Sequence, residues 1–106
     1  MLNDLGKHCH NLVYPVDRDI YTKSSDRYIY IIKSGKVRLE SEFKKLEVLD
    51  QYDFFGARSI FGLQSEAIRA KADSECVIFR IPEPLIDTLL KEIKEELVIL
   101  ASTKSL

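Results

Sequence analysis

The first 82 residues are built from short segments typical of β-strands, each followed closely by glycine, proline or a group of charged side chains. The clearest is Tyr28–Ile32, in which every residue is aromatic or β-branched. It leads through Lys33–Lys36, whose glycine can supply the positive φ of a hairpin, into Val37–Glu40, where apolar and charged residues alternate. Many short strands at close spacing predict a β-barrel or jelly roll rather than an alternating α/β sheet.

The segment Asp53–Ala72 interrupts this pattern with a glycine turn. Phe54-Phe55-Gly56 predicts a strand end and a tight turn, Ser59–Phe61 a short helical turn, and Glu66–Ala72 a return into the sheet. Unpaired backbone N–H groups converge at such a turn and can hold an anion, although most glycines between a strand and a helix only form the turn. The other predicted strands are Leu12–Tyr14, Ile20–Thr22, Leu46–Leu49 and Cys76–Ile81.

The spacing of apolar residues changes after Pro82, where a helical period replaces the strand period and predicts a helix that starts near Pro84. Charged residues between Asp87 and Glu95 occupy the opposite face. Such a stripe suits a helix packed on its own barrel, and it equally suits a helix that pairs with a second copy or with a partner domain. The stripe consists of Ile86, Leu90, Ile93, Leu97 and Leu100.

Composition excludes several classes of partner. The chain has 106 residues, the size of one domain, and its net charge of −1 gives no basic field for nucleic acid or an anionic membrane. No apolar run approaches the roughly 18 residues of a membrane span, and the N-terminus lacks the pattern of a signal peptide. The two cysteines, Cys9 and Cys76, are too few for a disulfide scaffold, so we expect a reduced, cytoplasmic protein.

The sequence contains one weak candidate for a metal site, His8-Cys9-His10. On a strand His8 and His10 share a face while Cys9 points away, and these are the only two histidines of the chain. We therefore expect no metal and no other cofactor, although an unidentified small-molecule ligand stays open. Because the sequence also lacks a nucleophile elbow, a P-loop and a paired-cysteine motif, we do not expect an enzyme.

Several motifs in register resemble the cyclic nucleotide-binding domain of the catabolite-activator/FNR superfamily, which also occurs in protein kinase A regulatory subunits and gated channels. They are Tyr14-Pro15, Asp19–Tyr21, Tyr28–Leu39, Asp53–Gly56 and Ala70–Ala72. The resemblance implies a mainly β fold, a jelly-roll β-roll of the cupin-like kind with short N-terminal and C-terminal helices. It implies a single domain over 1–106, with the β-roll over about 10–82 and C-terminal helices over 83–104.

The resemblance also implies a ligand-binding cassette, here with altered contacts. In that family the cassette begins with Phe-Gly-Glu, whose glutamate accepts from a ribose hydroxyl, and ends in an arginine that pairs with the cyclic phosphate. In this sequence Phe55-Gly56 is present, but Ala57 stands at the glutamate position, and counting back from Ala70 puts Glu66 at the arginine position. The implied pocket residues are Phe55, Gly56, Ala57, Arg58, Ser59, Ile60, Glu66, Ala67 and Arg69.

Three functions remain open on these residues. The first is a regulatory sensor module, as in signal transduction or transcription regulation, that does not bind cAMP or cGMP in the family's usual way. The second is a ligand-independent dimerisation or interaction module that works through the C-terminal helix. The third keeps cyclic nucleotide binding, with Arg58 or Arg69 as the phosphate partner. No basic recognition helix is present, so we expect no direct DNA binding by this chain.

Overall fold

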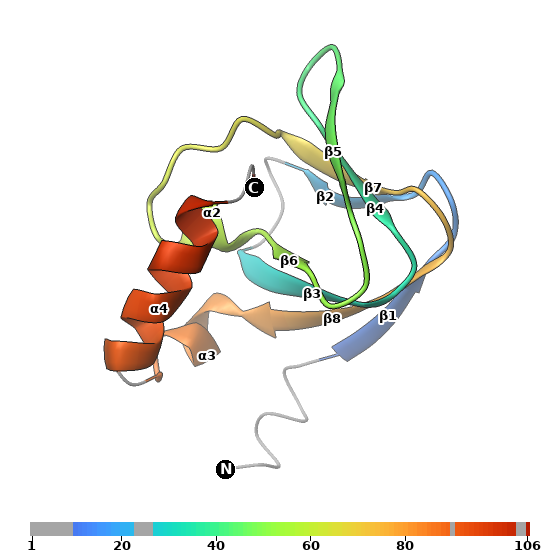
Figure 1. Ribbon diagram of the computed structural model, residues 1–106. Helices are drawn as coiled ribbons and strands as arrows, with labels where there is room; N and C mark the ends of the chain where they lie inside the picture. Colours follow the sequence, from blue (N-terminus) through green and yellow to red (C-terminus); the bar gives the residue numbers. More distant parts are fainter. Residues whose placement is uncertain (1–9, 23–26, 90, 104–105) are drawn as a thin grey trace.

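The computed structural model describes residues 10–22, 27–89, 91–103 and 106, and its strands form two four-stranded antiparallel sheets. One sheet has the order β1-β8-β3-β6 and the other β2-β7-β4-β5 (Figure 1). The strands are β1 His10–Tyr14, β2 Asp19–Thr22, β3 Tyr28–Ser34, β4 Val37–Glu40, β5 Lys45–Leu49, β6 Phe54–Phe55, β7 Arg69–Ala72 and β8 Cys76–Pro82. This is the mainly β jelly roll that the sequence predicted.

The side-chain alternation of each strand decides which residues enter the roll. In β4, Val37 and Leu39 are buried while Arg38 and Glu40 point outward, and in β7 the alanines at positions 70 and 72 are buried. The short alanine side chains let β7 lie close to the interior, where larger residues from the opposite sheet fill the space. The main core therefore lies between the two sheets.

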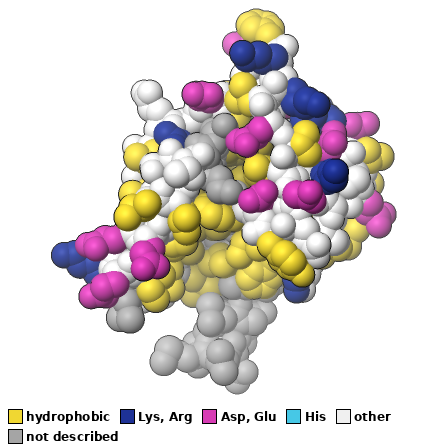
Figure 2. Space-filling view, viewed as in Figure 1, with side chains coloured by type: hydrophobic (Ala, Val, Ile, Leu, Met, Phe, Trp, Pro, Cys, Tyr) yellow, Lys and Arg dark blue, Asp and Glu magenta, His cyan; other side chains and the backbone are white. Residues whose placement is uncertain are grey.

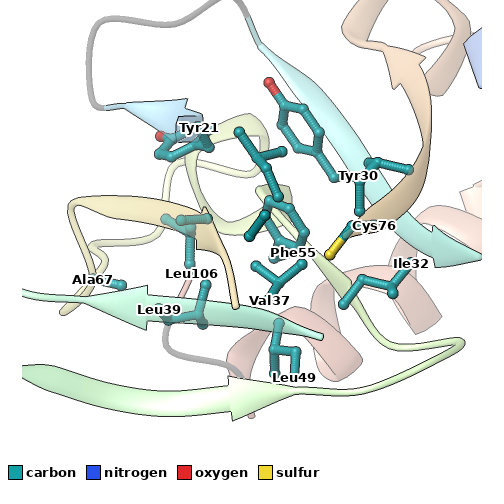
Figure 3. Close-up of a cluster of buried hydrophobic side chains, with 14 residues drawn as sticks. Tyr21, Tyr30, Ile32, Val37, Leu39, Leu49, Phe55, Ala67, Cys76 and Leu106 are labelled. Atoms are coloured by element: carbon teal, nitrogen blue, oxygen red, sulfur yellow. The ribbon is translucent and has the colours of Figure 1, made fainter. Parts of the chain in front are cut away.

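An aromatic group holds the middle of that core (Figure 3). Tyr30 on β3 lies opposite Phe55 on β6, and their rings stack with centroids 4.9 Å apart. Tyr21 meets Tyr30 edge to face at 6.0 Å, and Tyr28 is tilted against it at 5.8 Å. Because Tyr30 is only 2% exposed, burial raises the pKa of its hydroxyl. This group fixes the start of the segment that carries the predicted cassette.

Three helices follow from the segments after β6 and β8. Helix α2 spans Ala57–Ile60, α3 spans Glu83–Ile86 and α4 spans Lys91–Ser102, and α4 lies beside α2 (Figure 1). A second core cluster joins the helices to the roll through the buried residues Ile29, Ala57, Ile86 and Ala101. Arg27 connects α2 with α3, since it donates to the carbonyl oxygen of Ser59 at 2.7 Å and pairs with Glu83 at 2.9 Å.

The C-terminal apolar stripe lies on two helices and not on one continuous helix. Ile86 belongs to α3 and is 3% exposed, whereas Ile93 and Leu100 are exposed on α4 and Leu97 is half-buried. Figure 2 shows hydrophobic side chains on the surface of α4 and at the tip of the β4–β5 hairpin, where Phe43 is 90% exposed. Leu90, the predicted N-terminal helix, His8 and Cys9 lie outside the described residues.

No helix in the part of the chain that the structure describes is long and apolar enough to cross a membrane. Nor do three or more metal-binding side chains gather anywhere among the residues that the structure describes.

Candidate functional site

A cavity of about 510 Å³ opens between β2 and the segment that runs from α2 to β7. Among the described residues, its lining includes no lysine, arginine, histidine or carboxylate, and its polar groups are hydroxyls and an amide. Such a surface can donate and accept hydrogen bonds to a neutral molecule, but it offers no fixed cation for a phosphate. The lining residues are Tyr21, Ser59, Leu63, Gln64, Ser65, Ala67 and Ile68.

Gly56 sets the path of the chain into the cassette. Its φ of +89° belongs to the left-handed region, and a Cβ atom there would lie 2.6 Å from the Tyr28 carbonyl oxygen and 2.9 Å from the Tyr30 ring. The turn is closed by the Ser59 hydroxyl, which donates to the Gly56 carbonyl oxygen at 3.1 Å. The Phe-Phe-Gly motif is thus a packing requirement: a glycine must follow Phe55 so that the backbone can pass over Tyr28 and Tyr30.

The Gly56 N–H group has a distant partner. It donates to the main-chain oxygen of Leu106 at 3.2 Å. Leu106 is 1% exposed and belongs to the main core, together with Tyr21 and Ala67 of the cavity lining.

Arg58 holds backbone carbonyl groups. Its Nε donates to the Gln64 carbonyl oxygen at 2.6 Å, and its Nη1 donates to those of Ala101 and Ser102 at 3.2 and 3.3 Å. The last carbonyls of a helix have no partner within the helix and carry partial negative charge, so a guanidinium is well placed there. Arg58 therefore ties the cassette loop to the end of α4.

Arg69 lies in an ionic network on the outer face of the sheet β2-β7-β4-β5. Its Nε donates to Glu40 at 2.7 Å, and Arg38 reaches the other oxygen of that carboxylate at 2.6 Å. The hydrogen bond from Arg69, with that from Arg38, lowers the pKa of the Glu40 carboxyl against the opposing effect of its burial. Arg38 also donates to Asp73 at 2.8 Å.

The remaining predicted cassette residues are divided between the cavity and the second core cluster. Ser59 and Ala67 line the cavity, whereas Ala57 is fully buried beside α4 and Ile60 packs against the same cluster. Glu66 is exposed, lies outside the cavity lining and forms no ion pair within the described part of the chain, so it pairs with neither Arg58 nor Arg69.

Sequence reasoning missed five lining residues: Tyr21, Leu63, Gln64, Ser65 and Ile68. Leu63–Ser65 carries the composition of a surface loop, and Tyr21 has the appearance of an ordinary strand aromatic. The only sequence signal for Gln64 and Ser65 is their position directly before Glu66, the residue that the resemblance puts at the arginine position of the cassette.

The fold is shared with regulatory proteins of known structure. The regulatory domain of Toxoplasma gondii PKA with cAMP superposes with a TM-score of 0.78 and 14% identity, over 94% of this chain and 41% of that one. The Thermus thermophilus catabolite activator protein gives 0.68 and 17% identity, over 88% of this chain and 46% of that one. The regulatory subunit of a cAMP-independent protein kinase A from Trypanosoma brucei gives 0.65 and 14%, over 74% and 30%.

These relatives are longer than this chain, which spans less than half of each. A comparison with curated protein sequences gave no match. The sequence model of the cyclic nucleotide-binding domain, however, matches residues 14–92, which reach from the end of β1 into α4. The chain therefore belongs to the cyclic nucleotide-binding domain family.

Proposed function

We propose that this chain is a regulatory module of the cyclic nucleotide-binding fold that does not bind cAMP or cGMP in the family's usual way. The observation that carries this proposal is the neutral lining of the cavity in the described part of the chain. A cyclic phosphate taken out of water needs a fixed cation with matched hydrogen-bond donors.

The neighbouring arginines do not favour cyclic nucleotide binding through a substitute contact. Arg58 already donates to three carbonyl oxygens, and Arg69 is bonded to Glu40 on the outer face of the sheet. Turning either side chain into the cavity would break these bonds. A hydrogen bond made by a charged group contributes about 1.5–3 kcal/mol, so losing one would lower the affinity for a nucleotide roughly tenfold to a hundredfold.

The Trypanosoma brucei structure supports the same interpretation at the level of the fold, because that regulatory subunit is described as belonging to a cAMP-independent kinase. Fold similarity alone therefore does not predict a response to cAMP. We further place the module in the cytoplasm and without catalytic activity. The first point is supported by Cys76, which is a free thiol in the core, and the second by the family's regulatory members.

The test is a calorimetric titration of the purified chain with cAMP and cGMP. We expect no binding heat at ligand concentrations up to about 1 mM, and a Kd of that size corresponds to a binding free energy of only about −4 kcal/mol. A micromolar dissociation constant for either nucleotide would contradict the proposal.

Two charge variants test the reason for that result. Gln64→Arg puts a guanidinium on the cavity wall, whereas Gln51→Arg makes the same change at an exposed residue outside the lining. Binding by Gln64→Arg alone would indicate that the missing cation is what prevents binding in the natural chain. Equal binding by both would point to general attraction between a more positive surface and an anion.

Exposed apolar residues on α4 favour a second role, assembly with another copy or a partner domain. Ile93, Ile99 and Leu100 are 44%, 66% and 50% exposed. Light scattering measures the oligomeric state directly: a dimer that Ile99→Lys converts into a monomer would support the interaction role. If the natural chain is a monomer at about 100 μM, self-association is contradicted, and regulation through an attached domain is the alternative.

A further inference from the structure

We propose that the space between the Gly56 turn of the cassette and the strands of the roll is a binding site for an aliphatic residue of a peptide. The roll buries the side chain of that residue, and the Gly56 N–H group donates to its main-chain oxygen. The occupant in this chain is Leu106. The inference rests on the proposed function, because it names what takes the place of a nucleotide. The ligand class is a peptide segment rather than an anion.

Leu106 meets the roll through its side chain. It is 1% exposed, and in Figure 3 it lies between Tyr21 and Leu39 in the same buried cluster as Ala67 and Phe55. Tyr21 and Ala67 also line the open cavity, so Leu106 and the cavity share a wall. Complete burial of a leucine side chain removes apolar surface from water, which favours the bound position of a short segment.

Leu106 meets the cassette through its main chain. Gly56 is buried, so its N–H group needs a partner within the protein, and the Leu106 oxygen at 3.2 Å supplies it. The same turn is held rigid by Tyr28 and Tyr30, which leave no room for a side chain at position 56. The donor is therefore fixed in position before any ligand arrives.

The chain also keeps the occupant close to its site. Arg58, two residues after Gly56, holds the carbonyl oxygens of Ala101 and Ser102 at the end of α4. Leu106 lies only four residues beyond Ser102. A segment tethered over so short a distance acts at an effective concentration on the order of millimolar, so a diffusible ligand that uses the Gly56 N–H group must displace it.

Residue-by-residue hydrogen exchange tests the inference on the full chain. The Gly56 amide reports on the site, and the Ile32 amide, bonded to the Asp53 carbonyl oxygen at 2.9 Å in the roll, reports on unfolding of the roll. In the natural chain we expect Gly56 to exchange faster than Ile32, with little dependence on urea, because Leu106 leaves while the roll stays folded.

Two leucine variants provide the comparison. Leu106→Ala removes the buried side chain and should speed Gly56 exchange by about a hundredfold. Leu100→Ala makes the same change at a half-exposed residue of α4 and should leave Gly56 exchange within about twofold. If Leu106→Ala does not fold, Leu106→Val takes its place in the same comparison, with a smaller expected increase.

Two results would overturn the inference. If Gly56 and Ile32 exchange at one rate with one urea dependence, Leu106 is an ordinary core residue that leaves only when the roll unfolds. If the Leu106 variant leaves Gly56 exchange unchanged, Leu106 does not protect this site.

A titration of the Leu106 variant with cAMP separates this inference from the proposed function. Binding by the variant and not by the natural chain would show that Leu106 was the barrier, so the inference would stand and the explanation from missing contacts would fail. Binding by the natural chain itself would contradict the proposed function. If neither the natural chain nor the variant binds cAMP, and Gly56 exchanges by local opening, the results agree with both proposals.

Discussion

Replacing Gly56 by alanine should destabilise the fold through two separate costs. One comes from the backbone conformation of residue 56, and the other from the atoms that the new Cβ would meet. The φ of +89° costs a residue with a side chain about 1–2 kcal/mol. In addition, the new Cβ would lie 2.6 Å from the Tyr28 carbonyl oxygen and 2.9 Å from the Tyr30 ring. Overpacking of that kind typically costs a further 1–3 kcal/mol, because Tyr30 is stacked on Phe55 and cannot move freely. We expect a total loss of about 2–5 kcal/mol.

Gly62 is the matched control for this substitution. It also has a positive φ, +73°, but a Cβ there meets no atom within 4 Å. Gly62→Ala should therefore show the backbone cost alone, about 1–2 kcal/mol. Both losses are read from urea unfolding followed by circular dichroism, with unchanged m-values as the sign that the folded state is preserved. If Gly56→Ala costs no more than Gly62→Ala, the close approach to Tyr28 and Tyr30 does not constrain the cassette.

Two other predictions concern the charged side chains around the cassette. The pKa of Glu40 is lowered in the folded chain, so its ionised form stabilises the fold at pH values above the unfolded pKa, and this contribution is lost as the pH falls from about 4.3 through the folded pKa. Glu40→Gln should flatten the fall of the urea midpoint between pH 6 and 3, and a slope equal to that of the natural chain would contradict this. Arg58→Met should lower the free energy of unfolding by about 1–2 kcal/mol and speed hydrogen exchange in the last turn of α4, because it removes the donors to Ala101 and Ser102. Unchanged exchange in that turn would show that these bonds do not hold the helix.

The strands could be predicted because the alternation of apolar and polar residues within a strand indicates which side chains are buried. In Val37–Glu40 the apolar and charged residues alternate, and the structure places them alternately inside and outside the roll. The glycine turn was equally visible, since Phe54-Phe55-Gly56 marks both the strand end and the need for a positive φ. Such features depend on neighbours in sequence.

The contacts that shape the candidate site depend on residues far apart in the chain, and no local sequence pattern predicts them. The partners of Arg58 at the end of α4 are backbone carbonyls 43 and 44 positions away, which any residue type could supply. Leu106 follows the small and polar residues 102–105, so no apolar residue stands three or four positions before it. Its burial comes only from the three-dimensional fold.

The break between α3 and α4 could not be predicted from the spacing of apolar residues. Apolar residues continue at steps of three and four through this region, so the spacing fits one helix as well as two. Neither glycine nor proline stands between Ile86 and Lys91. The turn there is closed by the Thr88 hydroxyl, which donates to the Leu85 carbonyl oxygen at 2.7 Å, and a threonine in that position is not a specific sign of a helix end.

The pairing of β1 with β8 has a consequence for the synthesis of the chain on the ribosome. Tyr14 lies opposite Cys76 and Leu12 opposite Ile78, so the first described strand finds its partner only after more than sixty further residues have been added. At about 5–20 residues per second, β1 waits on the order of 3–12 seconds, much longer than a hairpin takes to form. During that interval Leu12 and Tyr14 have no sheet to cover them. The nascent chain is therefore most exposed to aggregation, and to capture by chaperones, before β8 emerges.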